Sequence, residues 1–218
     1  MTERFEGPHQ GQRVVVAGAP LARARAALIL THGRGATAES ILSLADALGA
    51  DDFAVYAPQA SGNTWYPYSF LNPIEQNEPG ISSGIQALAD IVETVERGGI
   101  PAERIALAGF SQGACLTLEF TARNARRYGA VAGFSGGVIG PDGTPRDYAG
   151  SLERTPVFLG CSDIDGHIPL ARVKLTTQVL TSLGAHVDER IYPGMGHTII
   201  DDEVAAVRAM LASVGNAS

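Results

Sequence analysis

Short apolar runs alternate along the chain with longer segments in which apolar residues recur at helical spacing. The apolar runs predict strands at residues 13–17, 26–31, 53–57, 104–109, 130–134, 156–161 and 187–192. Helical periodicity predicts helices at residues 38–48, 82–97, 112–126, 169–183 and 202–214. This alternation is typical of βαβ units, which build a parallel sheet with helices on both faces. We therefore expect an α/β fold with a mostly parallel central sheet, in one domain over residues 1–218.

Two segments lack such periodicity. Residues 59–79 form a long loop that holds Trp65, Tyr66, Tyr68 and Phe70. Aromatic residues outside a periodic core face suggest the wall of a binding site, and we expect Trp65 and Tyr66 to contribute to it. The alternative is that they pack the loop onto the sheet. Residues 135–155 are too few for a helical lid, so we expect an open site, which should admit short soluble molecules more readily than an aggregated lipid.

Composition and charge narrow the choice of partners. The chain has 218 residues, 45% of them hydrophobic, and a formal net charge of −7. Nucleic acids and anionic membranes are not expected as partners, because phosphate binding needs a basic face. The basic cluster of Arg123, Arg126 and Arg127 is expected instead to close the C-terminal end of a helix, where the dipole favours cations.

Further features concern location and assembly. No apolar run approaches the roughly 20 residues that span a bilayer, so we expect no stable membrane insertion. Residues 1–8 are polar and show no secretory signal. Cys115 and Cys161 are expected to be reduced core residues, which together with the missing signal favours the cytoplasm. Whether the protein forms a homodimer is left open.

The motif G-x-S-x-G occurs three times, and its surroundings select one copy. A nucleophile elbow needs a strand before the serine and a helix after it. Ser82 has no strand before it, and Ser135 is followed by a segment that cannot start a helix. Ser111 has both neighbours, so it is the candidate nucleophile. The flanking glycines fit because a Cβ there would crowd the tight turn.

A serine nucleophile needs a base, and the chain offers five histidines. We expect His9 to lie in a frayed terminus, His186 to be a half-exposed residue of the sheet, and His32 to stabilise a turn. His197 stands in a turn-rich loop after the last expected strand, at the end where parallel sheets present side chains to ligands. His197 is therefore the candidate base.

The acid that orients the base should lie between the two in sequence. Asp163 and Asp165 both follow the expected strand at 156–161, and spacing alone does not separate them. With His167 they could also form a plain loop or a metal site, although no further ligand-rich motif accompanies them. Glycines around residue 34 allow the backbone N–H of Arg34 to join that of Gln112 as donors to an oxyanion.

Four motifs in order resemble the phospholipase/carboxylesterase family of α/β-hydrolases, which includes bacterial carboxylesterases and acyl-protein thioesterases. They are L-T-H-G-R-G, A-G-F-S-Q-G-A, D-x-x-I-P and G-M-G-H, and they extend over nearly the whole chain. The resemblance implies an α/β-hydrolase fold over residues 1–218 without a large cap domain. It also implies hydrolysis of a small-molecule carboxylic ester or thioester through an acyl-enzyme, with no metal or organic cofactor.

The resemblance also assigns residues. It implies Asp165 as the orienting acid, with Asp163 as the alternative, and Arg34 and Gln112 as oxyanion donors through their backbones. Ile168 and Met195 are expected to line the acyl side. Many relatives carry an apolar residue in place of Arg34, so an Arg34 side chain directed into the cleft would favour an anionic or polar ester. A solvated Arg34 is the alternative.

Other functions stay open at this point. A serine peptidase or a dienelactone-type hydrolase could use the same fold, although the latter usually carries a cysteine nucleophile. A catalytically silent binding protein with this fold is a further alternative. A nucleotide-binding domain fits less well, because no G-x-G-x-x-G follows the first expected strand.

Overall fold

The computed structural model describes residues 5–215. The strands are β1 Val14–Gly18, β2 Ala26–Thr31, β3 Phe53–Pro58, β4 Ile105–Phe110, β5 Ala130–Phe134, β6 Pro156–Ser162 and β7 His186–Tyr192. The α-helices are α1 Ala38–Ala47, α2 Ile74–Asn77, α3 Gly80–Arg97, α4 Gln112–Arg123, α5 Leu170–Ser182 and α6 Asp201–Ala212. The first part of the polar N-terminal segment and both ends of the expected 1–218 domain lie outside the described residues.

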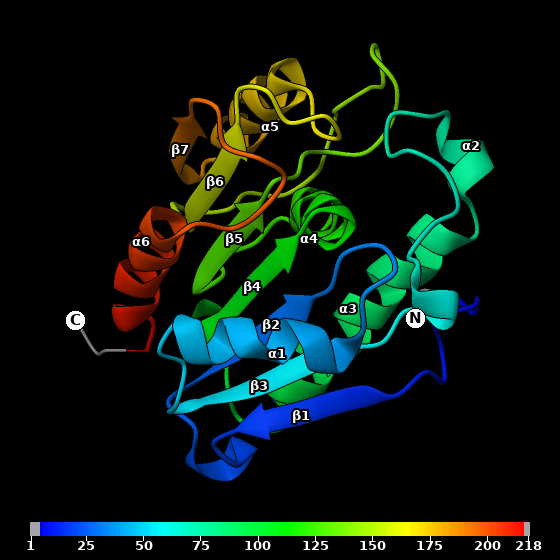
Figure 1. Ribbon diagram of the computed structural model, residues 1–218. Coiled ribbons are helices and arrows are strands. Elements are labelled where there is room, and N and C mark those ends of the chain that lie inside the picture. Colours follow the sequence, from blue (N-terminus) through cyan, green and yellow to red (C-terminus); the bar gives the residue numbers. More distant parts are fainter. Residues whose placement is uncertain (1–4, 216–218) are drawn as a thin grey trace.

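The strands form one twisted sheet in the order β1-β3-β2-β4-β5-β6-β7 (Figure 1). Only β1 is antiparallel to its neighbour, β3, and the remaining pairs are parallel. The central strands consist of residues buried on both faces, as parallel sheets between two helical layers require. The expected mostly parallel sheet is confirmed.

Helices cover the sheet on both faces, and each layer encloses its own apolar core. On one face α1 and α6 pack against β2 and β5 through residues such as Leu44 and Val207. On the other face α3, α4 and α5 bury a larger set that includes Leu88, Leu116 and Leu180. Within residues 5–215 no additional domain covers the carboxyl ends of the strands, so the expected absence of a large cap holds there.

Four expectations about individual elements need correction. Helix α4 ends at Arg123 rather than at residue 126, because Asn124 leaves helical geometry. Arg123 does lie in the last turn of α4, whereas Arg126 pairs with Glu96 and Arg127 donates to the carbonyl of Glu153. Helix α3 starts at Gly80, and the segment 59–79 includes the short helix α2.

His9 is not frayed, as the sequence suggested, but buried. Its Nε2 lies 2.8 Å from the carbonyl oxygen of Trp65, and its Nδ1 accepts the N–H of Ser61. Its own backbone N–H donates to Ser83 Oγ on α3. These partners are far away in sequence, which explains why local composition did not reveal them.

No helix within residues 5–215 combines the length and the apolar character needed to cross a membrane.

Candidate active site

The candidate nucleophile lies at the tight turn between β4 and α4. Ser111 has φ 56° and ψ −120°, a region that costs a non-glycine residue conformational energy. The glycines around it make the turn possible: a Cβ on Gly113 would lie 2.1 Å from the carbonyl oxygen of Thr31, and one on Gly109 would lie 2.6 Å from the Gly113 backbone. The two other motif serines lie elsewhere, Ser82 within α3 and Ser135 buried after β5.

Ser111, His197 and Asp165 form a continuous hydrogen-bonded chain. His197 Nε2 lies 2.7 Å from Ser111 Oγ, and His197 Nδ1 lies 2.7 Å from Asp165 Oδ2. The three side chains come from loops that follow β4, β6 and β7. Because the carboxyl ends of parallel strands meet at one edge of the sheet, residues 86 positions apart are brought into contact.

The Asp165 carboxylate is fully occupied. Its Oδ1 accepts the backbone N–H groups of His167, at 2.8 Å, and of Ile168, at 3.1 Å. Burial would raise the pKa of Asp165, but the hydrogen bonds from His197, His167 and Ile168 outweigh it and lower this pKa below its ordinary value. Cys161 Sγ, 3.8 Å from Asp165 Oδ2, is a further neighbour.

Asp163, the alternative acid, has a different neighbour. Its Oδ1 accepts the backbone N–H of Gly194 at 2.9 Å, within the loop that bears His197. Asp163 therefore fixes this loop without contacting the imidazole. The geometry favours Asp165 as the group that orients the base.

The two expected oxyanion donors are backbone N–H groups on segments next to the nucleophile turn. The Gln112 N–H belongs to the first turn of α4, whose amides have no acceptor within the helix. The Arg34 N–H belongs to the loop after β2, in which a Cβ placed on Gly33 would lie 3.4 Å from the carbonyl oxygen of Phe110 and 3.5 Å from Ser111 Cβ. The Arg34 loop is thus next to the elbow, as the oxyanion assignment requires.

The side chains of Gln112 and Arg34 hold the loop at residues 64–68. Gln112 Oε1 accepts the Trp65 N–H at 2.9 Å, and Gln112 Nε2 donates to the carbonyl of Tyr66 at 2.8 Å. Arg34 donates to Thr64 Oγ1 and to the carbonyls of Pro67 and Tyr68. Motif analysis considered only the backbone of Gln112, and a side chain that bridges to residues 46 and 47 positions away leaves no local signal.

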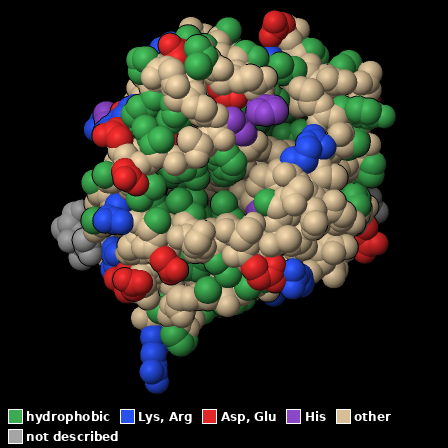
Figure 2. Space-filling view, viewed as in Figure 1, with side chains coloured by type: hydrophobic (Ala, Val, Ile, Leu, Met, Phe, Trp, Pro, Cys, Tyr) green, Lys and Arg blue, Asp and Glu red, His purple; other side chains and the backbone are tan. Residues whose placement is uncertain are grey.

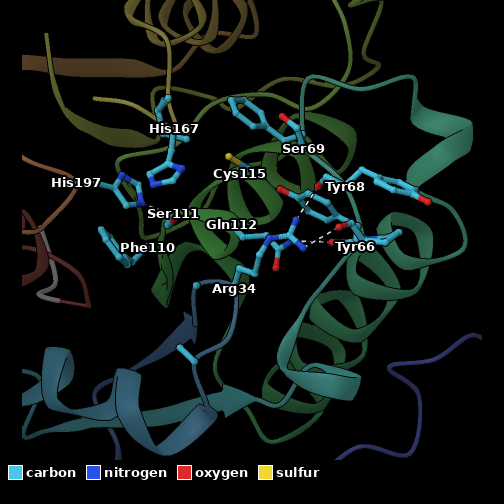
Figure 3. A pocket seen from close by; sticks show the side chains of 15 residues that line it. Arg34, Tyr66, Tyr68, Ser69, Phe110, Ser111, Gln112, Cys115, His167 and His197 are labelled. Carbon is cyan, nitrogen blue, oxygen red and sulfur yellow. Dashed lines mark hydrogen bonds between the residues drawn. The ribbon is translucent and has the colours of Figure 1, made fainter. Parts of the chain in front are cut away.

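A cleft of about 650 Å³ opens above Ser111. Figure 2 shows histidine side chains beside a hollow on this face of the molecule, with hydrophobic side chains next to them. Figure 3 shows His197, Phe110 and His167 on one side of Ser111 and Gln112 and Arg34 on the other, whereas the ring of Tyr68 points outward. The wall consists of Gly33, Arg34, Ala36, Tyr66, Pro67, Tyr68, Ser69, Phe70, Phe110, Gln112, Cys115, His167, Ile168 and His197.

Two of the four expected substrate-binding residues lie on this wall and two do not. Tyr66 and Ile168 line the cleft. Trp65 is completely buried and does not reach the cleft. Its indole Nε1–H donates to the carbonyl of His32, and its backbone N–H donates to Gln112 Oε1. Met195 lies in a turn where its N–H faces the carbonyl of Tyr192, and it is not part of the wall. For Trp65 and Met195 the expectation is therefore corrected.

His32 is fully buried and contacts the loop rather than the nucleophile. Its Nδ1 lies 2.8 Å from the carbonyl of Gly33, and its Nε2 accepts the N–H of Ala60 at 3.1 Å. Burial lowers the pKa of His32, which keeps the ring neutral. This agrees with the expected turn-stabilising role.

Sequence reasoning missed two rings that pack on the candidate base. The centroid of the Phe110 ring lies 5.0 Å from that of His197, and the His167 ring lies 4.7 Å away on a second side. Both residues are adjacent to motif positions, at the elbow and between Asp165 and Pro169, so their position in the motifs was the available signal.

The sheet order, the nucleophile elbow and the serine–histidine–aspartate chain define an α/β-hydrolase of the serine type. Within this class the chain belongs to the phospholipase/carboxylesterase family, whose model matches residues 11–214. This confirms the resemblance found in the sequence.

Individual relatives agree with this family. A solved phospholipase/carboxylesterase from Dyadobacter fermentans is 42% identical, with a TM-score of 0.91 over 97% of this chain and 100% of that one. Acyl-protein thioesterase 1 of Gibberella zeae is 28% identical over 62% of this chain and 59% of its own length. Acyl-protein thioesterase 1 of Debaryomyces hansenii is 29% identical over 65% of this chain and 62% of its own length. The match thus spans about three fifths of the length of these two curated relatives.

Proposed function

We propose that the protein is a serine hydrolase that cleaves carboxylic esters or thioesters of small to medium acyl groups through an acyl-enzyme. The observation that carries the proposal is the chain of two 2.7 Å contacts from Asp165 through His197 to Ser111, at the floor of an open cleft. The family and the relatives named carboxylesterase and acyl-protein thioesterase support it.

In the first half-reaction Ser111 Oγ attacks the carbonyl carbon while its proton moves to His197 Nε2. Asp165 accepts a hydrogen bond from His197 Nδ1, which fixes the tautomer and stabilises the imidazolium. The N–H groups of Arg34 and Gln112 donate to the oxyanion of the tetrahedral intermediate. When the intermediate collapses, the alcohol or thiol leaves with the proton from His197.

In the second half-reaction water attacks the acyl-enzyme. His197 takes a proton from this water, and the new tetrahedral intermediate expels Ser111, which regains the proton. The acid product then leaves through the open cleft, because among the described residues no cap domain covers it.

The test is the loss of activity and labelling at Ser111. We expect Ser111→Ala to lower kcat/KM for a p-nitrophenyl ester by roughly 10⁴–10⁶. A fluorophosphonate should form one covalent adduct with the wild type and none with this variant. Near-wild-type turnover by Ser111→Ala would contradict the assignment, and an unlabelled wild type would favour a silent binding protein.

A substrate panel separates the remaining enzyme alternatives. Graded p-nitrophenyl esters, a thioester and a peptide amide should be compared under the same conditions. Preference for the esters or the thioester supports the proposal, and faster cleavage of the peptide would favour a serine peptidase. A dienelactone-type activity is disfavoured by serine at position 111.

Location and assembly are proposals as well. A cytoplasmic site of action is supported by Cys115 and Cys161, which are both free and buried. The charge of −7 speaks against nucleic acid as a partner. Sedimentation would distinguish a monomer from the homodimer that the sequence leaves open.

A further inference from the structure

The cleft of this acidic protein contains one permanent cation. Among the described residues that line it, Arg34 is the only Lys or Arg, and none is Asp or Glu. Figure 2 shows a Lys or Arg side chain (blue) across the hollow from the histidine side chains (purple). A protein of net charge −7 repels anions at long range, so a local cation beside the nucleophile has a large influence on which substrates bind.

The guanidinium of Arg34 is fixed in place without being neutralised. Nη1 donates to Thr64 Oγ1 at 3.0 Å and to the Pro67 carbonyl at 2.9 Å, and Nη2 donates to the Tyr68 carbonyl at 2.6 Å. The carbon of the guanidinium lies 5.9 Å from the centroid of the Tyr66 ring. The hydroxyl, the two carbonyls and the aromatic ring are all uncharged. They fix the position of the guanidinium but do not neutralise its positive charge.

Two donors of Arg34 have no acceptor among the described residues. A guanidinium has five N–H donors, and the hydrogen bonds above use three. The remaining two are Nε–H and one hydrogen of Nη2. A planar cation with donors to spare matches a carboxylate, and its fixed position reduces the entropy lost on binding.

The placement of Arg34 indicates which half of the ester carries the anion. His197 must protonate the leaving oxygen or sulfur, so the leaving group lies on the His197 side of Ser111. Figure 3 shows Arg34 and Tyr66 on the opposite side of Ser111 from His197. The acyl group extends toward this side, along a wall that includes the apolar rings of Tyr66 and Phe70.

We propose that Arg34 selects esters or thioesters whose acyl chain ends in a carboxylate, namely half-esters of short dicarboxylic acids. This inference rests on the proposed function and adds the substrate class. The methylene groups of the acyl chain pack against the aromatic wall, and the terminal carboxylate binds Nε–H and Nη2–H of Arg34.

The test uses pairs of substrates that differ only in charge. Monomethyl succinate, glutarate and adipate are compared with the isosteric methyl esters that carry an isopropyl group in place of the carboxylate. The readout is the ratio of kcat/KM for the charged and the neutral ester, measured by methanol release. We expect a ratio above one for at least one chain length in the wild type.

Substitution of Arg34 should change this ratio. Arg34→Met should lower it by about ten- to a hundredfold, the effect of one charge-assisted hydrogen-bonded pair. Arg34→Lys should retain part of the preference. The ratio is used because the loop of Arg34 also supplies an oxyanion donor, and any general loss of rate cancels between the two esters. Added salt should lower the wild-type ratio, since an exposed cation is screened.

Arg13→Met is the matched control. Arg13 is exposed and pairs with Glu39, and its loss changes the net charge by the same amount outside the cleft wall. Its ratio should equal that of the wild type. An equal fall in Arg13→Met or an unchanged ratio in Arg34→Met would overturn the inference.

The outcome also separates this inference from the proposed function. If neutral esters are hydrolysed in a Ser111-dependent manner but no half-ester is preferred, only the role of Arg34 is wrong. If Ser111→Ala hydrolyses both esters at the wild-type rate, the proposed function itself is wrong.

Discussion

Two aspartates only two residues apart have different tasks at this site. Asp165 accepts the hydrogen bond of His197 Nδ1 and two backbone N–H groups, whereas Asp163 accepts the N–H of Gly194. One carboxylate therefore bonds the imidazole of the candidate base, and the other bonds the backbone of the loop that carries it. Sequence spacing could not separate them, because both follow the same strand.

The two roles predict different effects of the same chemical change. We expect Asp165→Asn to lower kcat by about 10⁴, because the amide favours the wrong tautomer of His197. Asp163→Asn keeps an oxygen that can accept the Gly194 N–H, so its kcat should stay within about tenfold of the wild type. Steady-state kinetics on one ester measures both, and a more severe defect in Asp163→Asn would reverse the assignment.

At the scale of elements, the turn between β4 and α4 depends on close backbone contacts. Gly113 packs against the end of β2 at Thr31, and Gly109 packs against Gly113. The sequence predicted this turn well, because strand, motif and helix are contiguous. It did not predict the start of α3, the end of α4 or the bonds from Gln112 to Trp65 and Tyr66, because these depend on contacts distant in sequence.

Gly113→Ala should therefore be strongly disruptive. The new Cβ would lie 2.1 Å from the Thr31 carbonyl, so α4 must shift. We expect a loss of about 1–3 kcal/mol in the free energy of unfolding and a large loss of activity. Urea denaturation and ester hydrolysis measure the two effects. Gly166→Ala is the control for stability alone, because nothing lies within 4 Å of its Cβ, and wild-type stability in Gly113→Ala would contradict the steric account.

The start of α6 contains a buried carboxyl group. Glu203 Oε2 accepts the N–H of Ile200 at 3.0 Å, and Oε1 is buried without a protein partner among the described residues. Burial raises the pKa of Glu203 to about 7 from an ordinary value of 4.5. The folded protein thus keeps a proton that the unfolded chain releases at lower pH.

This proton makes stability depend on pH in a definite direction. The contribution of Glu203 is complete below pH 4.5 and is lost as the pH rises to about 7, by at most about 3 kcal/mol. Glu203→Gln cannot titrate, so the difference in unfolding free energy between wild type and variant should change across this window. Urea titrations between pH 4.5 and 8 measure it, and a constant difference would exclude the effect.

At the scale of the whole molecule, the N-terminal segment supports the candidate site through the hydrogen bonds of His9. His9 connects Trp65, Ser61 and Ser83, and Trp65 in turn contacts Gln112 beside the nucleophile. The burial of His9 could not be predicted from the sequence, because its partners are distant along the chain. The order and type of the main elements could be predicted, from periodicity and from the motifs near the strand ends.

His9 and His32 should reduce stability in acid. Burial lowers both pKa values below the ordinary 6.5, so their contribution is present above pH 6.5 and is lost as the pH falls and the histidines protonate. His9→Gln should weaken this dependence and cost about 1–3 kcal/mol at pH 7.5, because buried partners lose their bonds. His186→Gln, at an exposed position of β7, is the control. Equal pH profiles for both variants would contradict the prediction.

Gln112 contributes both its backbone N–H and its side chain to this region, which limits the substitutions that the cleft wall can accept. Its backbone N–H is the proposed oxyanion donor, and its side chain bonds the backbone N–H of Trp65 and the backbone carbonyl of Tyr66. A substitution that moves the backbone at these two positions would therefore also move the proposed donor. Directed evolution toward new acyl groups should then accumulate substitutions at Tyr68, Ser69 and Phe70, which lie beyond these bonds, and leave residues 64–66 unchanged.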